Sequence, residues 1–209
     1  MNKRSKRILV AGRAGMDLYA LPVGTPIEKA TNFSSQLGGS AANIAAGLAV
    51  QGVEVSLLAG ISDDAIGRFV KNRCQRLRID AELLTIIPKV RNTLAIVDTM
   101  QEKTQAIIYR NSPADLYLEK NCINRIDLSS YEILVTTGTA LTHNPSRATI
   151  LRLMAKAREK NVEVIFDIDY REGTWTNKAE AEKILYQAAD YANIVVGNEL
   201  EFNFMSKTI

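Results

Sequence analysis

The stretch SSQLGGSAANIAAGLAVQG, at residues 34–52, joins two adjacent glycines to a run of small residues. A helix start presents unpaired backbone N–H groups, and Gly38 and Gly39 have no Cβ that would keep a ligand away from that backbone. Ser40 can cap the helix, and the amide of Asn43 in its first turn can both donate to and accept from a hydroxyl. The stretch predicts a site for a hydroxyl-rich ligand, although glycine and alanine could equally serve close packing of the helix on a sheet.

The chain around this junction alternates between strand and helix patterns. Short apolar runs rich in β-branched residues predict the strands of a buried parallel sheet. These runs occupy residues 7–12, 54–60, 131–137, 163–168 and 193–196. Helices are expected between them, at residues 41–51, 63–78, 145–160 and 178–189. Ser62 is a plausible N-cap of the second helix. The alternation predicts a doubly wound, mostly parallel α/β sheet.

Two segments interrupt this alternation, at residues 18–37 and 83–110. The second includes an expected hairpin in which residues 101–103 separate TLAIVDTM from TQAIIYR. We interpret both segments as a small β-layer inserted into the α/β body, placed to act as a lid beside the carboxyl ends of the parallel strands.

Composition and charge exclude several classes of function. The 209 residues are 46% hydrophobic and 23% charged with a net charge of +3, as expected of a soluble globular protein. The basic run at residues 3–7 is interpreted as a solvated tail, so no nucleic-acid partner is expected. No secretory signal or membrane span is found, which makes the cytoplasm the expected location. Cys74, Cys122 and His143 form no zinc set and no catalytic pair.

The polar residues, taken in chain order, resemble the PfkB family of carbohydrate kinases, which has the ribokinase-like fold. Asp17 lies shortly after the first strand, where its carboxylate could accept hydrogen bonds from two sugar hydroxyls. The glycine pair, Asn43, Gly52 and the DDAIG series at residues 63–67 are similar to the N-terminal signature of the family. Ser62 stands where the family usually has glycine. The resemblance implies that residues 1–209 form the N-terminal portion of a sugar kinase that uses ATP and Mg²⁺.

Two later motifs agree with this resemblance. FDIDYR, at residues 166–171, is similar to the family's D-x-N-x-R, with Asp169 where asparagine is more usual. Asn198 and Glu201 fit its N-x-x-E motif. Three residues apart at a helix start, these two side chains share a face and could organise the water shell of a magnesium ion beside phosphate oxygens.

Arginines indicate the substrate class. Arg110 and Arg171 resemble two arginines that 2-keto-3-deoxygluconate kinases direct at the substrate, and paired arginines favour the carboxylate of a sugar acid over a neutral sugar. Arg13 in GRAGMDLY and the stretch DIDYREGTW more closely resemble the inositol-catabolism branch, the 5-dehydro-2-deoxygluconokinases. A 2-keto-3-deoxygluconate kinase, a fructokinase or a ribokinase are the alternatives.

The sequence lacks the G-A-G-D motif in which PfkB kinases carry their catalytic base. No catalytic residue is therefore assigned here, and the chain is expected to be C-terminally truncated relative to the family and inactive alone. Edge strands in the inserted layer favour a homodimer through it. A non-catalytic module that binds a sugar acid or dimerises is the alternative from another class.

Overall fold

The computed structural model describes residues 7–100 and 104–206, and its centre is a five-stranded parallel sheet. The strand order is β11-β10-β9-β1-β4. These strands span Ile194–Val196, Glu163–Asp167, Ile133–Thr137, Arg7–Ala11 and Glu54–Leu58. All four pairings are parallel, so the predicted parallel α/β sheet is confirmed.

Within the described residues, five α-helices connect or flank these strands. They are α1 (Ser40–Val50), α2 (Ala65–Arg76), α3 (Ser146–Glu159), α4 (Lys178–Tyr191) and α5 (Glu199–Ser206). Short 3₁₀ helices span Ile27–Lys29, Ala114–Leu116, Lys120–Arg125, Leu128–Ser130, Gly138–Leu141 and Glu172–Thr174. Among the described residues, no helix has the length and apolar character needed to cross a lipid bilayer.

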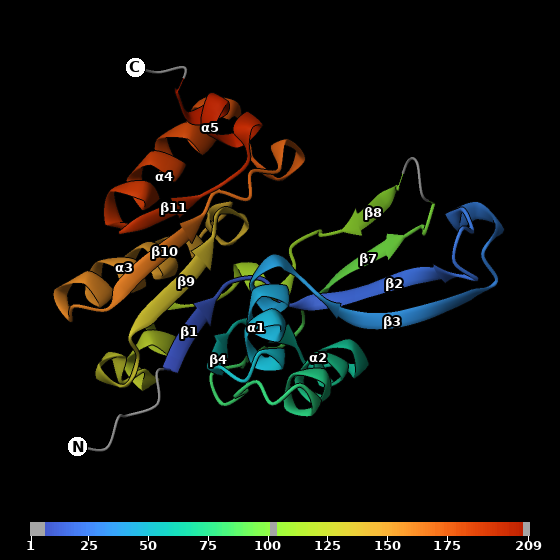
Figure 1. Cartoon of the computed structure of the whole chain (residues 1–209), viewed down its shortest axis with the longest axis horizontal. Helices are drawn as coiled ribbons and strands as arrows, with labels where there is room; N and C mark the ends of the chain where they lie inside the picture. The colour runs from blue at the N-terminus through green and yellow to red at the C-terminus, as the bar shows by residue number, and fades with distance from the viewer. Residues whose placement is uncertain (1–6, 101–103, 207–209) are drawn as a thin grey trace.

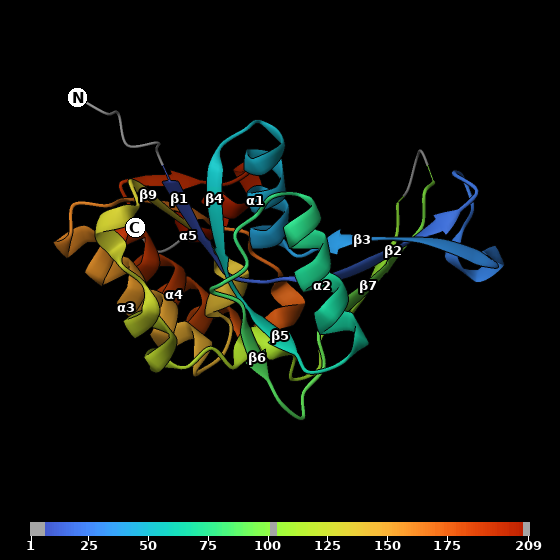
Figure 2. The same ribbon diagram turned by 90° about the horizontal axis from the view of Figure 1, so that it is seen from below.

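Helices cover both faces of the sheet because successive side chains of each strand point to opposite faces. In β1, Leu9 and Ala11 belong to the core formed with α3 and α4, whereas Val10 belongs to the core formed with α1 and α2. Figure 2 shows α1 and the α3–α4 pair on opposite sides of β1 and β9. This arrangement leaves the carboxyl ends of the strands as the edge at which loops and side chains from both layers meet.

A four-stranded sheet, here called the β-layer, projects from one end of the body (Figure 1). Its order is β3-β2-β7-β8, with β2 at Gly15–Leu21, β3 at Asn32–Gly38, β7 at Thr93–Val97 and β8 at Ala106–Tyr109. The layer begins at Gly15, three residues before the expected segment. β7 and β8 form the expected antiparallel hairpin, whose turn at residues 101–103 lies outside the described residues.

Four local expectations need correction. The strand expected at residues 54–60 ends at Leu58, and a separate strand β5 (Gly60–Ser62) pairs with β6 (Thr85–Ile87), so part of the 83–110 segment lies outside the β-layer. The N-cap of α2 is Asp64, whose carboxylate accepts from the N–H groups of Ile66 and Gly67. Ser62 instead hydrogen-bonds Asp64 and Asn92.

The third correction concerns Ser40, which is the first residue of α1 and not its cap. The N-cap is Gly39, which makes no side-chain cap bond. The basic run at residues 3–7 is described only at Arg7, which begins β1 and pairs with Asp80 at 3.1 Å. Arg7 is therefore a structural residue, and not part of a solvated tail.

Candidate functional site

The glycine pair brings β3, α1 and the loop after β1 into close contact. Gly39 has a φ of 98°, and a Cβ there would lie 2.5 Å from the carbonyl oxygen of Arg13. A Cβ on Gly38 would lie 2.0 Å from a carboxylate oxygen of Asp17. Both glycines are thus required for packing, and this packing presses Asp17 and the Arg13 backbone against the start of α1.

Asp17 lies within β2, and so on the β-layer itself. Burial raises the pKa of this carboxyl, and the charge of Arg13 acts in the opposite direction. Tyr19 lies two residues further along β2 and therefore on the same face. Burial and the charge of Asp17 raise the pKa of the Tyr19 hydroxyl. The β-layer thus presents a carboxylate and a phenol on one face, beside the parallel sheet.

Asn43 is exposed on the first turn of α1. Its side chain makes no hydrogen bond to any residue within 7–100 and 104–206. Its amide group is therefore available to a ligand, and the predicted contact with a sugar hydroxyl stays a prediction.

A cluster of hydroxyl groups was not expected from the sequence. Ser40 Oγ lies 3.1 Å from Thr137 Oγ1 and 3.0 Å from Thr139 Oγ1, and the two threonine oxygens are 3.0 Å apart. Thr139 also donates to a carboxylate oxygen of Asp169 at 3.0 Å. The cluster joins the start of α1 to the carboxyl ends of β9 and β10, and the only sequence signal for it is the TTGT run at residues 136–139.

Arg110 is held by a buried ion pair with Asp115. Their charged groups are 2.6 Å apart, and their side chains are only 6% and 1% exposed. The Arg110 guanidinium also donates to the carbonyl oxygen of Thr139 at 2.9 Å, and Thr93 donates to Asp115 at 2.8 Å. The Nε of Arg110 is buried without a hydrogen-bond partner among the described residues. The sequence indicated Arg110 but not Asp115, which neutralises its charge.

Arg171 forms an ion pair with Asp169, just beyond the carboxyl end of β10. It lies 3.1 Å from Asp169, with the arginine side chain 63% exposed and the aspartate 6% exposed. Asp169 adopts a left-handed backbone conformation with a φ of 35°. Burial raises the pKa of the neighbouring Asp167, and the charge of Asp169 raises it further. The two acids at the end of β10 thus lie close together, with Arg171 bound to one of them.

Arg13 follows β1 and joins this charged group. Burial and the charge of Arg110 lower the pKa of its guanidinium, whereas Asp115, Asp169 and Asp17 raise it. Its Nε is buried and lacks a hydrogen-bond partner in the described part of the chain. The structure therefore brings Arg13 close to Arg110 and Asp17, and joins Arg171 to this group through Asp169.

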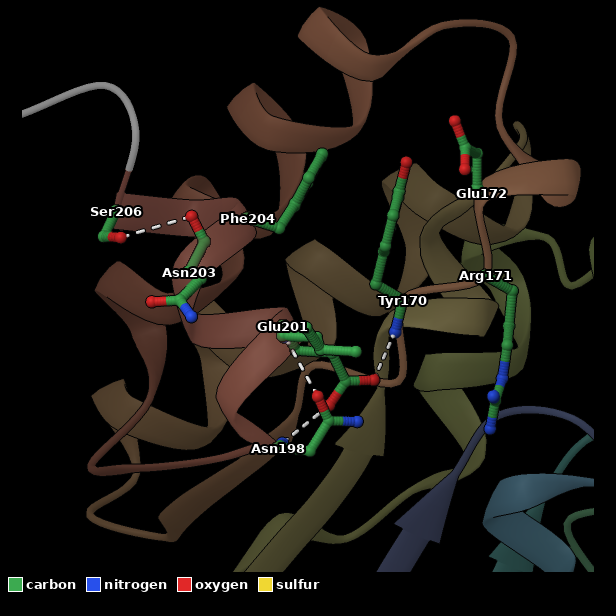
Figure 3. Close-up of a pocket in the computed structure, with 9 residues that line it drawn as sticks. Tyr170, Arg171, Glu172, Asn198, Glu201, Asn203, Phe204 and Ser206 are labelled. Carbon is green, nitrogen blue, oxygen red and sulfur yellow. Dashed lines mark hydrogen bonds between the residues drawn. The ribbon is translucent and has the colours of Figure 1, made fainter.

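Asn198 and Glu201 form a reciprocal cap at the start of α5. The N–H of Asn198 donates to Glu201 at 2.9 Å, and the N–H of Glu201 donates to the side chain of Asn198 at 3.0 Å. The other oxygen of Glu201 accepts from the N–H of Tyr170 at 3.0 Å. Figure 3 shows these contacts, with Arg171 running away from Asn198 and Glu201 on the far side of Tyr170.

A cavity of about 690 Å³ opens beside this cap. It is lined by Tyr170, Arg171, Glu172, Asn198, Leu200, Glu201, Asn203, Phe204 and Ser206. The rings of Tyr170 and Phe204 stack with centroids 4.0 Å apart. The lining includes Arg171 but not Arg13, Asp17 or Gly39, so the space that Asn198 and Glu201 face meets the arginine cluster only at Arg171. Between residues 7–100 and 104–206, no three His, Cys, Asp or Glu side chains form a group that could hold a metal ion.

Known proteins are similar to this chain in sequence and in fold. The chain matches the family described as "pfkB family carbohydrate kinase" over residues 5–208. A 5-dehydro-2-deoxygluconokinase from Listeria monocytogenes serotype 4b is 34% identical over 214 residues, which cover 100% of this chain and 66% of that relative. This chain therefore spans about 66% of that relative's length.

Solved structures show the same fold. A sugar kinase from Pyrococcus horikoshii in complex with ATP superposes with a TM-score of 0.86 at 22% identity, over 96% of this chain and 66% of that one. A fructokinase from Xylella fastidiosa gives a TM-score of 0.87 at 21% identity, over 98% of this chain and 63% of that one. At this identity the likeness establishes a ribokinase-like fold. Because the family match extends over nearly all of its length, the chain belongs to the pfkB family of carbohydrate kinases.

Proposed function

We propose that the protein containing this chain transfers the γ-phosphate of ATP to a primary hydroxyl of a deoxy keto sugar acid, with 5-dehydro-2-deoxygluconate as the best candidate. The observation that carries this proposal is that Arg13 lies near Arg110, Asp17 and Asp169, and that Arg171 is joined to this group through its ion pair with Asp169. Guanidinium groups match the planar geometry of a carboxylate. The name of the Listeria relative supports the same substrate.

Each predicted substrate residue has a role in this proposal. Asp17, Gly38, Gly39 and Asn43 contact the sugar hydroxyls, while Arg110 and Arg171 lie at the carboxylate end and Arg13 contributes specificity. One terminal nitrogen of Arg110 donates to both Asp115 and Thr139, and the other donates to Thr142. Arg110 therefore contributes through its Nε, which has no partner among the described residues.

ATP is the proposed phosphate donor, in line with the ATP complex of the Pyrococcus horikoshii kinase. Asn198 and Glu201 would hold the water shell of Mg²⁺ beside the phosphate oxygens. Each Glu201 oxygen accepts one backbone N–H, which leaves a second lone pair to accept from a metal-bound water. When bound, Mg²⁺ neutralises phosphate charge. The cytoplasmic location predicted from the sequence stays a prediction.

The test is phosphorylation by the full-length enzyme of 5-dehydro-2-deoxygluconate, 2-keto-3-deoxygluconate, fructose and ribose. We expect the highest kcat/KM with the first acid. A preference for fructose or ribose would contradict the sugar-acid assignment. Tight acid binding without turnover of any of the four would favour the non-catalytic module.

We further propose a homodimer through the β-layer. β8 is one of the two edge strands of that sheet, and its Ile107, Ile108 and Tyr109 are 40%, 46% and 55% exposed. Exposed apolar edge strands favour pairing with a second chain. Sedimentation velocity should give a dimer that Ile107→Lys converts to a monomer, whereas Ile86→Lys on β6, another exposed isoleucine, should leave it dimeric.

A further inference from the structure

Arg13 is the one arginine of the cluster that forms no ion pair within the described residues, although the charges of Asp115, Asp169 and Asp17 act on it. Its guanidinium forms no hydrogen bond and no ion pair with any residue in the described ranges 7–100 and 104–206. Arg13 is nevertheless partly buried, with its Nε shielded from solvent. Its backbone cannot move away easily, because its carbonyl oxygen accepts from the N–H of Ala42 and packs on Gly39.

The other two arginines are already neutralised. Arg110 forms its ion pair with Asp115, and Arg171 forms its pair with Asp169. Each aspartate is almost fully buried. Neither arginine can therefore turn away to a ligand without leaving a buried carboxylate that has lost its counter-charge. The capacity of the cluster to accept one more negative charge therefore rests on Arg13.

A partly buried guanidinium without a hydrogen bond or ion pair is costly, since it loses hydration and gains only the more distant attraction of the carboxylates. Groups that break the rules of stable packing in this way concentrate at functional sites, where a ligand supplies the missing partner. We infer that Arg13 binds the carboxylate of the sugar acid directly, with the free Nε of Arg110 beside it, and that Arg13 sets the preference for acids over neutral sugars. This inference rests on the function proposed above and assigns the carboxylate contact within it.

The inference predicts opposite effects on stability for two neighbouring arginines. Arg13→Gln removes an unpaired cation, so the melting temperature of the ligand-free protein should be equal to or higher than that of the wild type. Arg110→Gln leaves Asp115 buried without its partner, so that variant should melt at a lower temperature. An arginine needed only for structure would lower the melting temperature when replaced.

Isothermal titration calorimetry on the purified protein tests binding, with 5-dehydro-2-deoxygluconate and fructose as the two probes. Arg13→Gln should weaken binding of the acid by roughly 10- to 150-fold, the effect expected for one charge-assisted contact, and leave fructose binding unchanged. Arg13→Lys should restore part of the affinity, because it keeps the charge but not the bidentate geometry. Arg68→Gln, at an exposed arginine on α2, is the matched control and should bind both probes like the wild type.

The outcomes separate the inference from the proposed function. If the wild type prefers the acid and Arg13→Gln retains that preference, the Arg13 assignment is wrong while the sugar-acid function stands. If the wild type itself binds fructose as well as or better than the acid, the proposed function fails and the inference fails with it. A melting temperature of Arg13→Gln well below the wild type would also overturn the inference, because it would show a structural role.

Discussion

Glu201→Gln should lower the free energy of unfolding, because the native carboxylate accepts two backbone N–H groups at once. One oxygen accepts from Tyr170 at 3.0 Å and the other from Asn198 at 2.9 Å, and the side chain is buried. A glutamine amide has a single acceptor oxygen, so its NH₂ group must face one of these two donors.

The loss amounts to one hydrogen bond to a charged acceptor, which is about 1.5–3 kcal/mol. In a protein of this size, each kcal/mol shifts the melting temperature by roughly 2–4 °C. The expected fall for Glu201→Gln is therefore roughly 3–12 °C. The melting temperature of Glu201→Ala, which removes both acceptor oxygens, should fall further.

Urea unfolding and thermal melting measure the effect, and hydrogen exchange locates it at the amides of Tyr170 and Asn198. Glu199→Gln is the matched control, since Glu199 is exposed on the same helix. If the free energy of unfolding of Glu201→Gln lies within about 0.5 kcal/mol of the wild-type value, the size of a neutral surface change, then the two contacts do not hold this segment together.

Asp17→Ala should reduce kcat/KM of the full-length kinase for the sugar acid by roughly 10- to 150-fold without changing the circular dichroism spectrum, and unchanged kinetics would remove Asp17 from the site. Asp64→Ala should lower the free energy of unfolding at pH 7 by about 1 kcal/mol, because it removes the cap of α2. Burial raises the pKa of Asp64, but its hydrogen bonds and Arg91 outweigh this and hold the pKa below the ordinary 3.8. The stabilisation is therefore present above pH 3.8 and lost as pH falls through the lower folded pKa, so a deficit that persists in strong acid would contradict it. The 209-residue polypeptide by itself should release ADP at least roughly 10⁴-fold more slowly than the full-length kinase, because the family resemblance implies that the catalytic base and the backbone donors to the transferring phosphate belong to the G-A-G-D motif, which is not found in these residues. Turnover near that of the full-length kinase that disappears with Asp17→Ala would show that a base lies within this chain, with Asp167 and Asp169 as the first residues to mutate.

The sequence predicted the parallel sheet, its helices and the β7–β8 hairpin, because these depend on short-range periodicity. A buried parallel strand needs an apolar run, and a helix needs apolar residues at its own spacing, so both patterns are readable locally. The predicted ends of helices and strands were less accurate, since helix caps and strand breaks depend on individual contacts. Asp64 rather than Ser62 caps α2, and the run at residues 54–60 divides into β4 and β5.

The sequence also indicated Asp17, Asn43, Arg110 and Arg171 as site residues, through their place after strands and their resemblance to family motifs. Their roles in binding stay predictions. What only the tertiary structure decided is which charges are paired. Asp115 neutralises Arg110, whereas Arg13 is left without a partner among the described residues.

The hydroxyl cluster was decided in the same way. Ser40 meets Thr137 and Thr139 from 97 and 99 residues away, and Thr139 meets Asp169 from 30 residues away. Local spacing carries no information about such contacts, because they exist only when the carboxyl ends of separate strands converge at one edge of the sheet. The sequence by itself thus determined the elements and most of the polar residues of the site, and the fold determined which of those residues remain free to bind a ligand.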